Sequence, residues 1–192
     1  MGRIRSAWEI ALERTESIEV DENKIRLNAK IEEIRKIAGA FLSSEERDLS
    51  KLEKLDAYDR DEIKQGLKIA LMGSVTLSAN KIPSERLERL IILSSYVFKD
   101  EESYSLYGKL LQLVAQYPEH REQLVQQLEE TLEPELRQKE AMMKEQYGQE
   151  VHLSLEDDKE MMEIIKSNLD KLNRQYEELI KGAKEKLEKF FA

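Results

Sequence analysis

The sequence contains no cysteine, and it has only 3 prolines, 7 glycines and 6% aromatic residues. Without cysteine the chain can form no disulfide bond and offers no thiolate as a nucleophile or as a zinc ligand. Proline and glycine interrupt helices, so their scarcity beside abundant Leu, Ile, Glu, Lys and Gln favours long helices. These absences predict a helical protein without disulfide or thiolate chemistry.

Long apolar runs are also missing. No run approaches the roughly 18 residues that a membrane-spanning helix needs, and the N-terminus lacks the apolar segment of a signal peptide. Charged residues make up 37% of the chain, and the net charge is −9. A nucleic-acid binder needs a concentrated basic face to neutralise phosphates. We therefore expect a cytoplasmic protein that binds no nucleic acid, and we do not favour a membrane as its partner.

Apolar residues recur every three or four positions through most of the chain, as they do on one face of an α-helix. The 192 residues are enough to bury a sizeable core. We expect a single all-α domain over residues 1–192, a multi-helix bundle with a long C-terminal antiparallel helical hairpin. Its predicted parts are N-terminal helices over 1–58, apolar core helices over 59–117 and the hairpin over 118–192.

Prolines, a glycine and a capping box predict where the hairpin is interrupted. Because proline lacks a backbone N–H, Pro118 is expected to end the core helix and Pro134 to kink or restart the next one. Gly148 is expected to close that helix in the left-handed conformation. The pair Ser154 and Asp157 has the spacing of a capping box and predicts the start of the last helix.

Two glycines interrupt an otherwise regular core helix. Gly66, Ala70 and Gly73 fall on one face, although glycine costs about 1 kcal/mol relative to alanine inside a helix. We interpret the pair as a place where a neighbouring helix comes close, and a groove for a small ligand is the alternative. If packing is the reason, Gly73→Leu should cost several kcal/mol through overpacking.

Residues that could carry chemistry are few. A di-iron carboxylate bundle has glutamate three residues before its ligand histidine, whereas His120 follows Tyr117 and His152 follows Gln149 at that spacing. The chain has no H-E-x-x-H, no G-x-S-x-G and no EF-hand loop. Its acidic stretch "EDDKEMME" is typical of a helix N-terminus, which stabilises carboxylates. We predict no catalytic, cofactor-binding or metal-binding residue, no cofactor and no enzyme activity.

The first residues, "MGRIRSAWEIALERTES", leave several readings open. Met1-Gly2 with Ser6 fits the N-myristoylation pattern, but Ser6 is explained more simply as the N-cap of a short helix. Trp8, the single tryptophan, and Leu12 would share one side of that helix. The helix could dock on its own bundle, on a protein partner or on a membrane surface.

The last helix has an apolar stripe with a period near 3.6, the value of a straight helix. The stripe consists of Met161, Ile165, Leu169, Leu172, Tyr176, Leu179, Ala183, Leu187 and Phe190. Adjacent residues on a helix point about 100° apart, so Phe190 and Phe191 cannot both enter one narrow seam. The candidate interaction residues are therefore Trp8, Leu12, Phe190 and Phe191, with a protein partner or a second copy as the ligand.

Both ends of the chain resemble an uncharacterised family of bacterial all-helical proteins. The start "SAWEIALERT" is similar to the family's S-A-x-E-x-A-L-E-R-T, and "QYGQEVHL" with the later "NLDKL" is similar to Q-Y-G-x-x-V-x-L followed by N-L-x-x-L. These are family markers without a chemical role. The resemblance implies a bacterial cytoplasmic setting and no known activity, so it assigns no functional residue.

Three functions remain open. The favoured one is a non-catalytic helical interaction or scaffold protein, or an accessory subunit of a larger cytoplasmic assembly. The second is a peripheral membrane-associated protein that uses the N-terminal amphipathic helix. The third is an enzyme with a carboxylate-based or metal-assisted site, which a buried cluster of three or more acidic residues would support.

Overall fold

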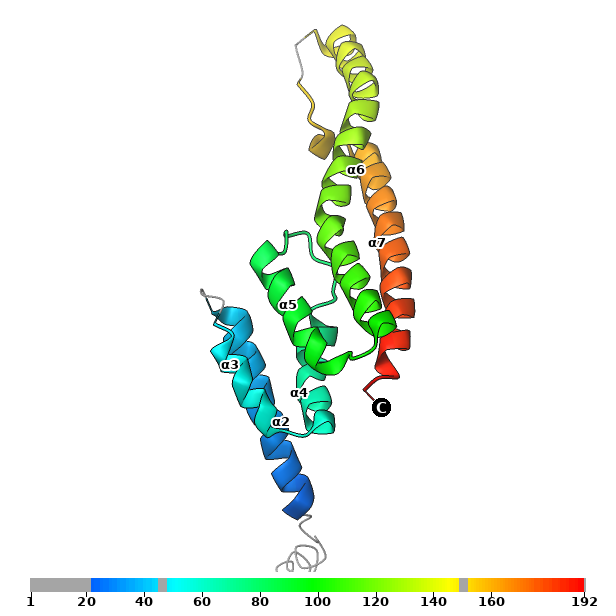
Figure 1. The fold of residues 1–192 in the computed structure, drawn as a ribbon. Helices are drawn as coiled ribbons and strands as arrows, with labels where there is room; N and C mark the ends of the chain where they lie inside the picture. Colours follow the sequence, from blue (N-terminus) through cyan, green and yellow to red (C-terminus); the bar gives the residue numbers. More distant parts are fainter. Residues whose placement is uncertain (1–21, 45–47, 149–151, 192) are drawn as a thin grey trace, which may run out of the picture.

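The computed structural model of the chain describes residues 22–44, 48–148 and 152–191. This described part consists of six α-helices and two short 3-10 helices, without a strand. They are α2 (Glu22–Ser43), α3 (Ser50–Glu53), η1 (Lys54–Ala57), α4 (Arg60–Gly73), α5 (Ser84–Val97), α6 (Glu101–Tyr147), η2 (Leu155–Asp157) and α7 (Lys159–Glu188). The predicted all-α class is confirmed, and α6 and α7 form the long antiparallel hairpin (Figure 1).

Helix α2 packs along α4 with one apolar face. Its buried residues are spaced by three and four, as the sequence predicted; they are Ile31, Ile34, Ala38 and Phe41. At its C-terminal end, the guanidinium of Arg89 from α5 donates hydrogen bonds to the carbonyl oxygens of Leu42 and Ser44. Carbonyls at a helix end have no partner within the helix, so Arg89 joins the end of α2 to α5.

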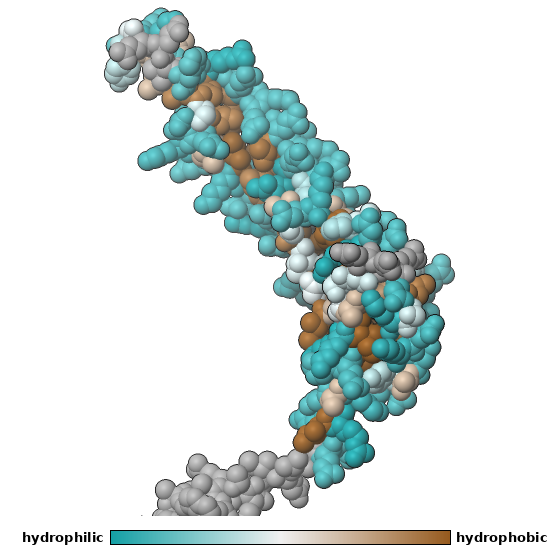
Figure 2. Space-filling view, turned by 90° about the vertical axis from the view of Figure 1, so that its left-hand side faces the viewer, coloured by the Kyte–Doolittle hydropathy of each residue, from teal (hydrophilic) through white to brown (hydrophobic). Residues whose placement is uncertain are grey.

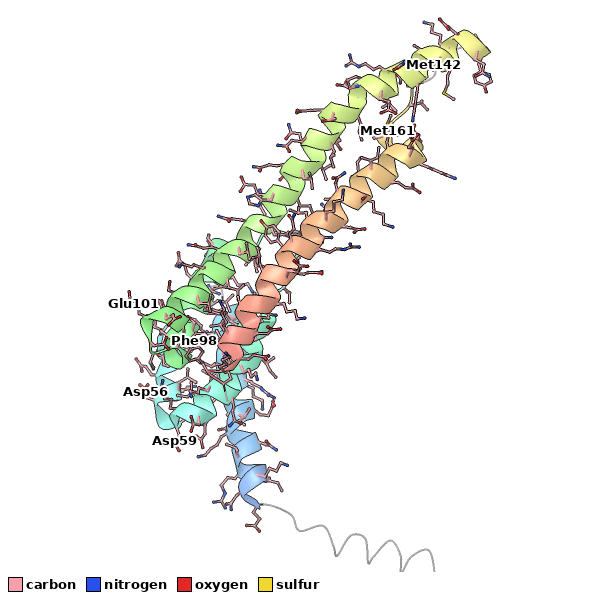
Figure 3. The ribbon with its side chains drawn as sticks, turned by 90° about the vertical axis from the view of Figure 1, so that its right-hand side faces the viewer. Asp56, Asp59, Phe98, Glu101, Met142 and Met161 are labelled. Atoms are coloured by element: carbon pink, nitrogen blue, oxygen red, sulfur yellow. The ribbon has the colours of Figure 1, made fainter. Side chains whose placement is uncertain are left out.

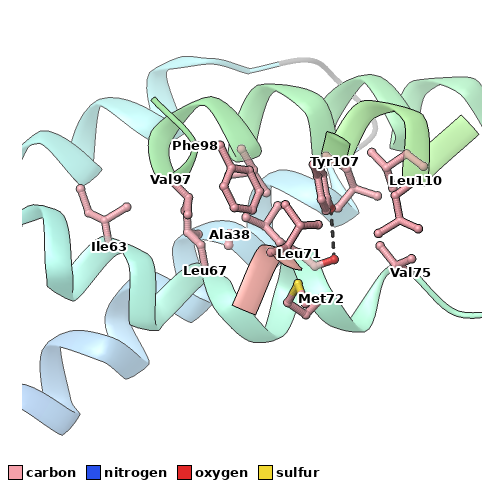
Figure 4. Close-up of a cluster of buried hydrophobic side chains, with 14 of the residues drawn as sticks. Ala38, Ile63, Leu67, Leu71, Met72, Val75, Val97, Phe98, Tyr107 and Leu110 are labelled. Atoms are coloured by element: carbon pink, nitrogen blue, oxygen red, sulfur yellow. Dashed lines mark hydrogen bonds between the residues drawn. The ribbon is translucent and has the colours of Figure 1, made fainter. Parts of the chain in front are cut away.

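The main core lies where α4 and α5 meet the first turns of α6 and the last turns of α7 (Figure 4). Its fully buried large side chains include Leu67, Leu71, Leu90, Leu93, Tyr107, Leu111 and Leu187. The Tyr107 hydroxyl donates to the carbonyl oxygen of Leu71 at 3.1 Å, in the last turn of α4. Burial raises the pKa of this hydroxyl far above its usual value. It therefore stays protonated and holds α6 to the end of α4.

The two glycines of α4 differ in their surroundings. Gly66 is buried against α2, and a Cβ atom there would lie 2.4 Å from Ile34 Cγ2. Gly73 is exposed, and nothing lies within 4 Å of a Cβ atom built on it. The predicted close packing is therefore confirmed at Gly66 and wrong at Gly73. Helices that cross at an angle come close only near the crossing point, and Gly73 lies two turns beyond it.

Helix α6 continues through both Pro118 and Pro134, so the predicted stop and restart are wrong. A proline inside a helix costs about 3 kcal/mol, but α6 packs against α7 on both sides of each proline. Pro118 is itself buried, and Leu136, which follows Pro134, is buried against α7. The first helix of the hairpin therefore starts at Glu101 inside the core, upstream of residue 118.

The ends of the hairpin helices are capped locally. Gly148 ends α6 with a φ of 70°, the predicted left-handed conformation. The capping box of Ser154 and Asp157 is present, but it caps the N-terminus of the short η2 and not that of α7. Helix α7 is capped by Asp158, whose carboxylate accepts from the backbone N–H of Glu160 at 3.0 Å. The start of the last helix was thus predicted a few residues too early.

Candidate functional site

Beyond the main core, α6 and α7 continue side by side as a two-helix arm, defined here as residues 119–171 (Figures 1 and 3). The arm has its own apolar cluster, separate from the main core, whose buried members are Leu132, Leu136, Met161 and Ile165. Two helices cannot enclose an apolar seam on all sides. Accordingly, apolar atoms reach the surface along the arm in a narrow strip between hydrophilic side chains (Figure 2).

A cluster of aromatic and polar side chains joins the two helices at the base of the arm. The Tyr117 hydroxyl donates to Asn173 Oδ1 at 2.5 Å, and the rings of Tyr117 and Tyr176 meet edge to face with centroids 5.1 Å apart. His120 Nδ1 is hydrogen-bonded to the Tyr176 hydroxyl. Burial raises the pKa of Tyr176, and the neighbouring Tyr117 adds to the shift. These contacts set the register between α6 and α7 where the arm leaves the core.

Ion pairs hold the far end of the arm together. Lys139 Nζ on α6 lies 2.7 Å from a carboxylate oxygen of Asp158 and 3.4 Å from one of Glu160. The hydrogen bond with Asp158 raises the pKa of Lys139, and the same contact lowers the pKa of Asp158. The carboxylate of Glu140 accepts from the backbone N–H of Leu153 at 2.8 Å. Leu153, before η2, is thereby joined to α6, and Asp158, at the start of α7, is joined to α6 by Lys139.

Methionine side chains come to the surface at this end. Met142, Met143 and Leu153, which we call the tip patch, are the apolar residues that line a hollow of about 510 Å³. The rest of the hollow is charged, formed by Lys139, Asp157, Asp158, Lys159 and Glu160. Met142 is 58% exposed, whereas Met143 and Leu153 are half-buried. The tip patch is therefore an apolar surface with a charged rim.

The arm is strongly acidic. Among its described residues, 14 aspartate and glutamate side chains accompany 7 lysine and arginine side chains. Several of the cations are already paired within the arm, for example Arg137 with Glu133 and Lys139 with Asp158. The surplus of carboxylates gives the arm a negative field that extends about 8–10 Å at physiological salt. Such a field favours cationic partners and disfavours anionic ones.

The predicted interaction residues lie elsewhere. Phe190 and Phe191 both contact the ring of Phe98 in the main core, with centroids 6.2 and 5.6 Å apart. Phe191 is partly buried there and has the ammonium group of Lys68 above its ring, whereas Phe190 is 38% exposed. Trp8 and Leu12 lie outside the described residues. The assignment of these four residues to an interaction stays a prediction.

A pattern in the sequence does indicate the surface at the end of the arm, although the predicted interaction residues that the structure describes lie elsewhere. Four of the six methionines occur as two pairs, Met142-Met143 and Met161-Met162, in segments that the fold brings to the same end of the arm (Figure 3). Each pair lies in a charged stretch where a helical apolar stripe needs only one residue per turn. One member of each pair therefore had to face away from the stripe, and these are Met142 and Met162.

No group of three His, Asp or Glu side chains in residues 22–44, 48–148 and 152–191 is arranged to hold a metal ion. Nor is any helix within these ranges long and apolar enough to cross a membrane.

The fold and this surface define an all-helical bundle protein with a projecting two-helix arm. The chain belongs to a family of unknown function (DUF6657), whose model matches residues 49–189. The match covers α3 to α7, with the entire arm, and confirms the membership in an uncharacterised family that the sequence predicted. Neither a curated protein nor a solved structure matches the chain.

Proposed function

We propose that this protein is a non-catalytic helical interaction protein, a scaffold or an accessory subunit of a larger assembly, and that the arm binds its protein partner. The observation that carries the proposal is the apolar cluster of the arm, which two helices cover incompletely. Large apolar side chains remain at the surface there; Met142, Tyr147 and Met162 are 58%, 63% and 40% exposed. Apolar surface grouped on a projecting element is typical of protein interaction sites.

The arm is suited to docking because its apolar cluster is separate from the main core. The main core is built from α2, α4 and α5 with the proximal parts of α6 and α7. None of the arm residues that the structure describes is among the buried residues of that core. The length of the arm and its separate cluster therefore require a reason outside the stability of the bundle, and contact with another protein supplies one.

The setting we propose is the bacterial cytoplasm, supported by the resemblance of both chain ends to a family of bacterial proteins. The net charge of −9 supports a protein partner over a nucleic acid. Trp8, Leu12, Phe190 and Phe191 are proposed as further contact residues.

The test compares the full chain with a variant whose arm is shortened. Residues 125–169 are replaced by a short Gly/Ser linker, which keeps the contacts of Tyr117 with Asn173 and Tyr176 and every residue of the main core. Circular dichroism and a thermal melt establish that the bundle remains folded. We expect the full chain to capture a protein from the native host that the shortened variant does not. If both capture the same proteins, the arm is not the binding element and the proposal fails.

A further inference from the structure

We propose that the tip patch binds a basic amphipathic helix of a partner protein. This inference rests on the proposed function and specifies the chemistry of the partner at the end of the arm. Three observations carry it: the methionine side chains of the patch, the shape of the tip and the charge of the arm.

Methionine is suited to such a contact because its side chain is unbranched, flexible and polarizable. It adapts to the irregular apolar face of a helix and is common at surfaces that bind amphipathic helices. Four of the six methionines lie at this end of the arm, but their environments differ. Met161 is fully buried in the arm cluster, whereas Met142 is 58% exposed. Met161 thus supports the tip, and Met142 is free to contact a partner.

The shape of the tip favours a helix. The hollow of about 510 Å³ is lined by apolar side chains from α6 and from the segment before η2, and by charged side chains from α6, η2 and the start of α7. A third helix laid along two others would complete a three-helix arrangement and cover the exposed flank of the arm cluster. Such a helix presents apolar residues at positions i, i+3, i+4 and i+7.

The charge of the arm selects a basic partner. Carboxylates outnumber cations by 14 to 7 along the described arm. The hollow itself is lined by the carboxylates of Asp157, Asp158 and Glu160 and by the ammonium groups of Lys139 and Lys159. Asp158 is paired with Lys139, whereas Glu160 lies 3.4 Å from the same lysine and is 76% exposed. Glu145, one turn after Met142 on α6, and Glu156 in η2 are also exposed. A second copy of this acidic arm or an anionic membrane would be repelled, while lysine and arginine on the polar face of a helix would be attracted.

The experiment measures fluorescence anisotropy of a labelled peptide against the full chain. The probe is a helical peptide of about five turns, with Leu and one Trp on one face and Lys on the other. Its twin carries Glu at every Lys position. We expect the basic peptide to bind and the acidic twin not to bind. Binding of both peptides with equal affinity, or of neither, overturns the inference.

Matched variants locate the site. Met142→Ser should weaken binding of the basic peptide at least about fivefold, whereas Leu179→Ser, which removes an equally exposed side chain (59%) of α7 outside the arm, should change it less than about twofold. Equal losses from the two variants would place the peptide elsewhere and overturn the inference. Retained helicity of each variant, measured by circular dichroism, shows that a loss of binding is not a loss of fold.

Charge is tested with two triple variants of equal net charge. Glu145→Gln, Glu156→Gln and Glu160→Gln neutralise the tip, and Glu177→Gln, Glu178→Gln and Glu185→Gln neutralise exposed carboxylates of α7 beyond the arm. The tip variant should lose about tenfold in affinity at low salt, and the difference should shrink as salt screens the charges. A larger loss in the second variant overturns the inference.

Self-association of the full chain that Met142→Ser abolishes, measured by analytical ultracentrifugation, would show that a second copy occupies the patch and would overturn the inference. If the basic peptide fails to bind while the shortened-arm variant still loses its captured partner, the chemistry proposed for the partner is wrong and the proposed function stands. If the shortened arm also captures the same proteins, both are wrong.

Discussion

At the residue scale, the contact between Gly66 of α4 and Ile34 of α2 determines how close the two helices lie. Adding a methyl group at Gly66 places a carbon 2.4 Å from Ile34 Cγ2 and 2.6 Å from Ile34 Cβ, neither of which is the far end of a flexible chain. We expect Gly66→Ala to lower the free energy of unfolding by about 2–3 kcal/mol, because α2 and α4 must move apart. Urea denaturation measures the change.

The matched control is Gly73→Ala in the same helix. Nothing lies within 4 Å of its added carbon, so the variant should be neutral or more stable by up to about 1 kcal/mol through helix propensity. The same open space corrects the prediction that Gly73→Leu would be severely destabilising. A Gly66→Ala variant as stable as Gly73→Ala would show that the two helices have room to separate.

Arg89 of α5 is a buried cation, 7% exposed, that donates hydrogen bonds to carbonyl oxygens at the C-terminal end of α2. Arg89→Met keeps most of the side-chain volume but leaves the carbonyls of Leu42 and Ser44 without this donor. We expect the free energy of unfolding to fall by about 2 kcal/mol, the range for hydrogen bonds of a charged group. Arg86→Met, an exposed position on the same helix, should change it by less than about 0.5 kcal/mol. Equal effects in the two variants would contradict this account of Arg89.

The methionines should differ in their reaction with hydrogen peroxide. Oxidation to the sulfoxide follows exposure of the sulfur, and Met142 and Met162 are exposed while Met72 and Met161 are buried. Peptide mass spectrometry over a time course should find the sulfoxide at Met142 and Met162 first. Early oxidation of Met161 would show that the arm cluster opens in solution.

At the scale of the elements, carboxylates at helix starts and in ion pairs make stability depend on pH. Hydrogen bonds with Ser103 lower the pKa of Asp100 at the start of α6, and Lys139 lowers that of Asp158 at the start of α7. Lys30 lowers the pKa of Glu62 in the same way. These groups bind protons less readily in the folded than in the unfolded chain. Their contribution is therefore present above their usual pKa values and is lost as the pH falls through the lowered ones.

The expected result is a melting temperature that is nearly constant from about pH 5 to 7 and falls below about pH 4. Asp158→Asn should make the fall shallower, because one of the shifted groups no longer titrates. Thermal melts followed by circular dichroism over this range measure both. A melting temperature that rises on acidification would contradict the assignment of these pKa shifts.

At the scale of the whole molecule, the end of α7 belongs to the bundle. Ile180 and Leu187 are 7% and 0% exposed in the main core, and Phe191 packs beside them. Truncation after Leu179 should therefore unfold the bundle or leave it without a cooperative melting transition, because the contacts of α7 with α6 and with Phe98 are lost. Size-exclusion chromatography and circular dichroism of the truncated chain are the measurements.

Phe191→Ser is the milder control for that truncation, because Phe191 is only partly buried and lies at the end of the helix. It should lower stability without abolishing the fold. If the truncated chain stays folded with an unchanged melting temperature, the last turns of α7 do not belong to the core. Any loss of association in Phe191→Ser would then bear directly on the interaction predicted for Phe190 and Phe191.

Local patterns were enough to predict the elements. The helical period of the apolar residues predicted the all-α class and the buried face of α2, and Gly148 predicted the end of α6. These patterns wrongly predicted breaks at Pro118 and Pro134. The free-energy cost of a proline depends on its own helix, whereas the contacts that offset this cost come from α7. The patterns also placed Leu179 in the stripe of the last helix, although Leu179 is 59% exposed and Ile180 is buried. Met161, Ile165, Tyr176 and Leu187 of the predicted stripe are buried, so the period itself was right. Leu179 and Ile180 point about 100° apart, and only the packing against the other helices decides which of the two neighbours is buried.

The sequence by itself thus determined the helical class, the absence of thiol chemistry, the acidic charge and the hairpin, because each follows from composition or from contacts between near neighbours. Only the tertiary structure decided which glycine of α4 packs against α2 and that Arg89 bonds to the end of α2. It also decided that the two methionine pairs meet at one end of the arm. These depend on distances between residues far apart in the chain, which helical periodicity does not contain. The proposed partner surface belongs to this second group, since an apolar side chain becomes a binding residue only where the fold leaves it uncovered.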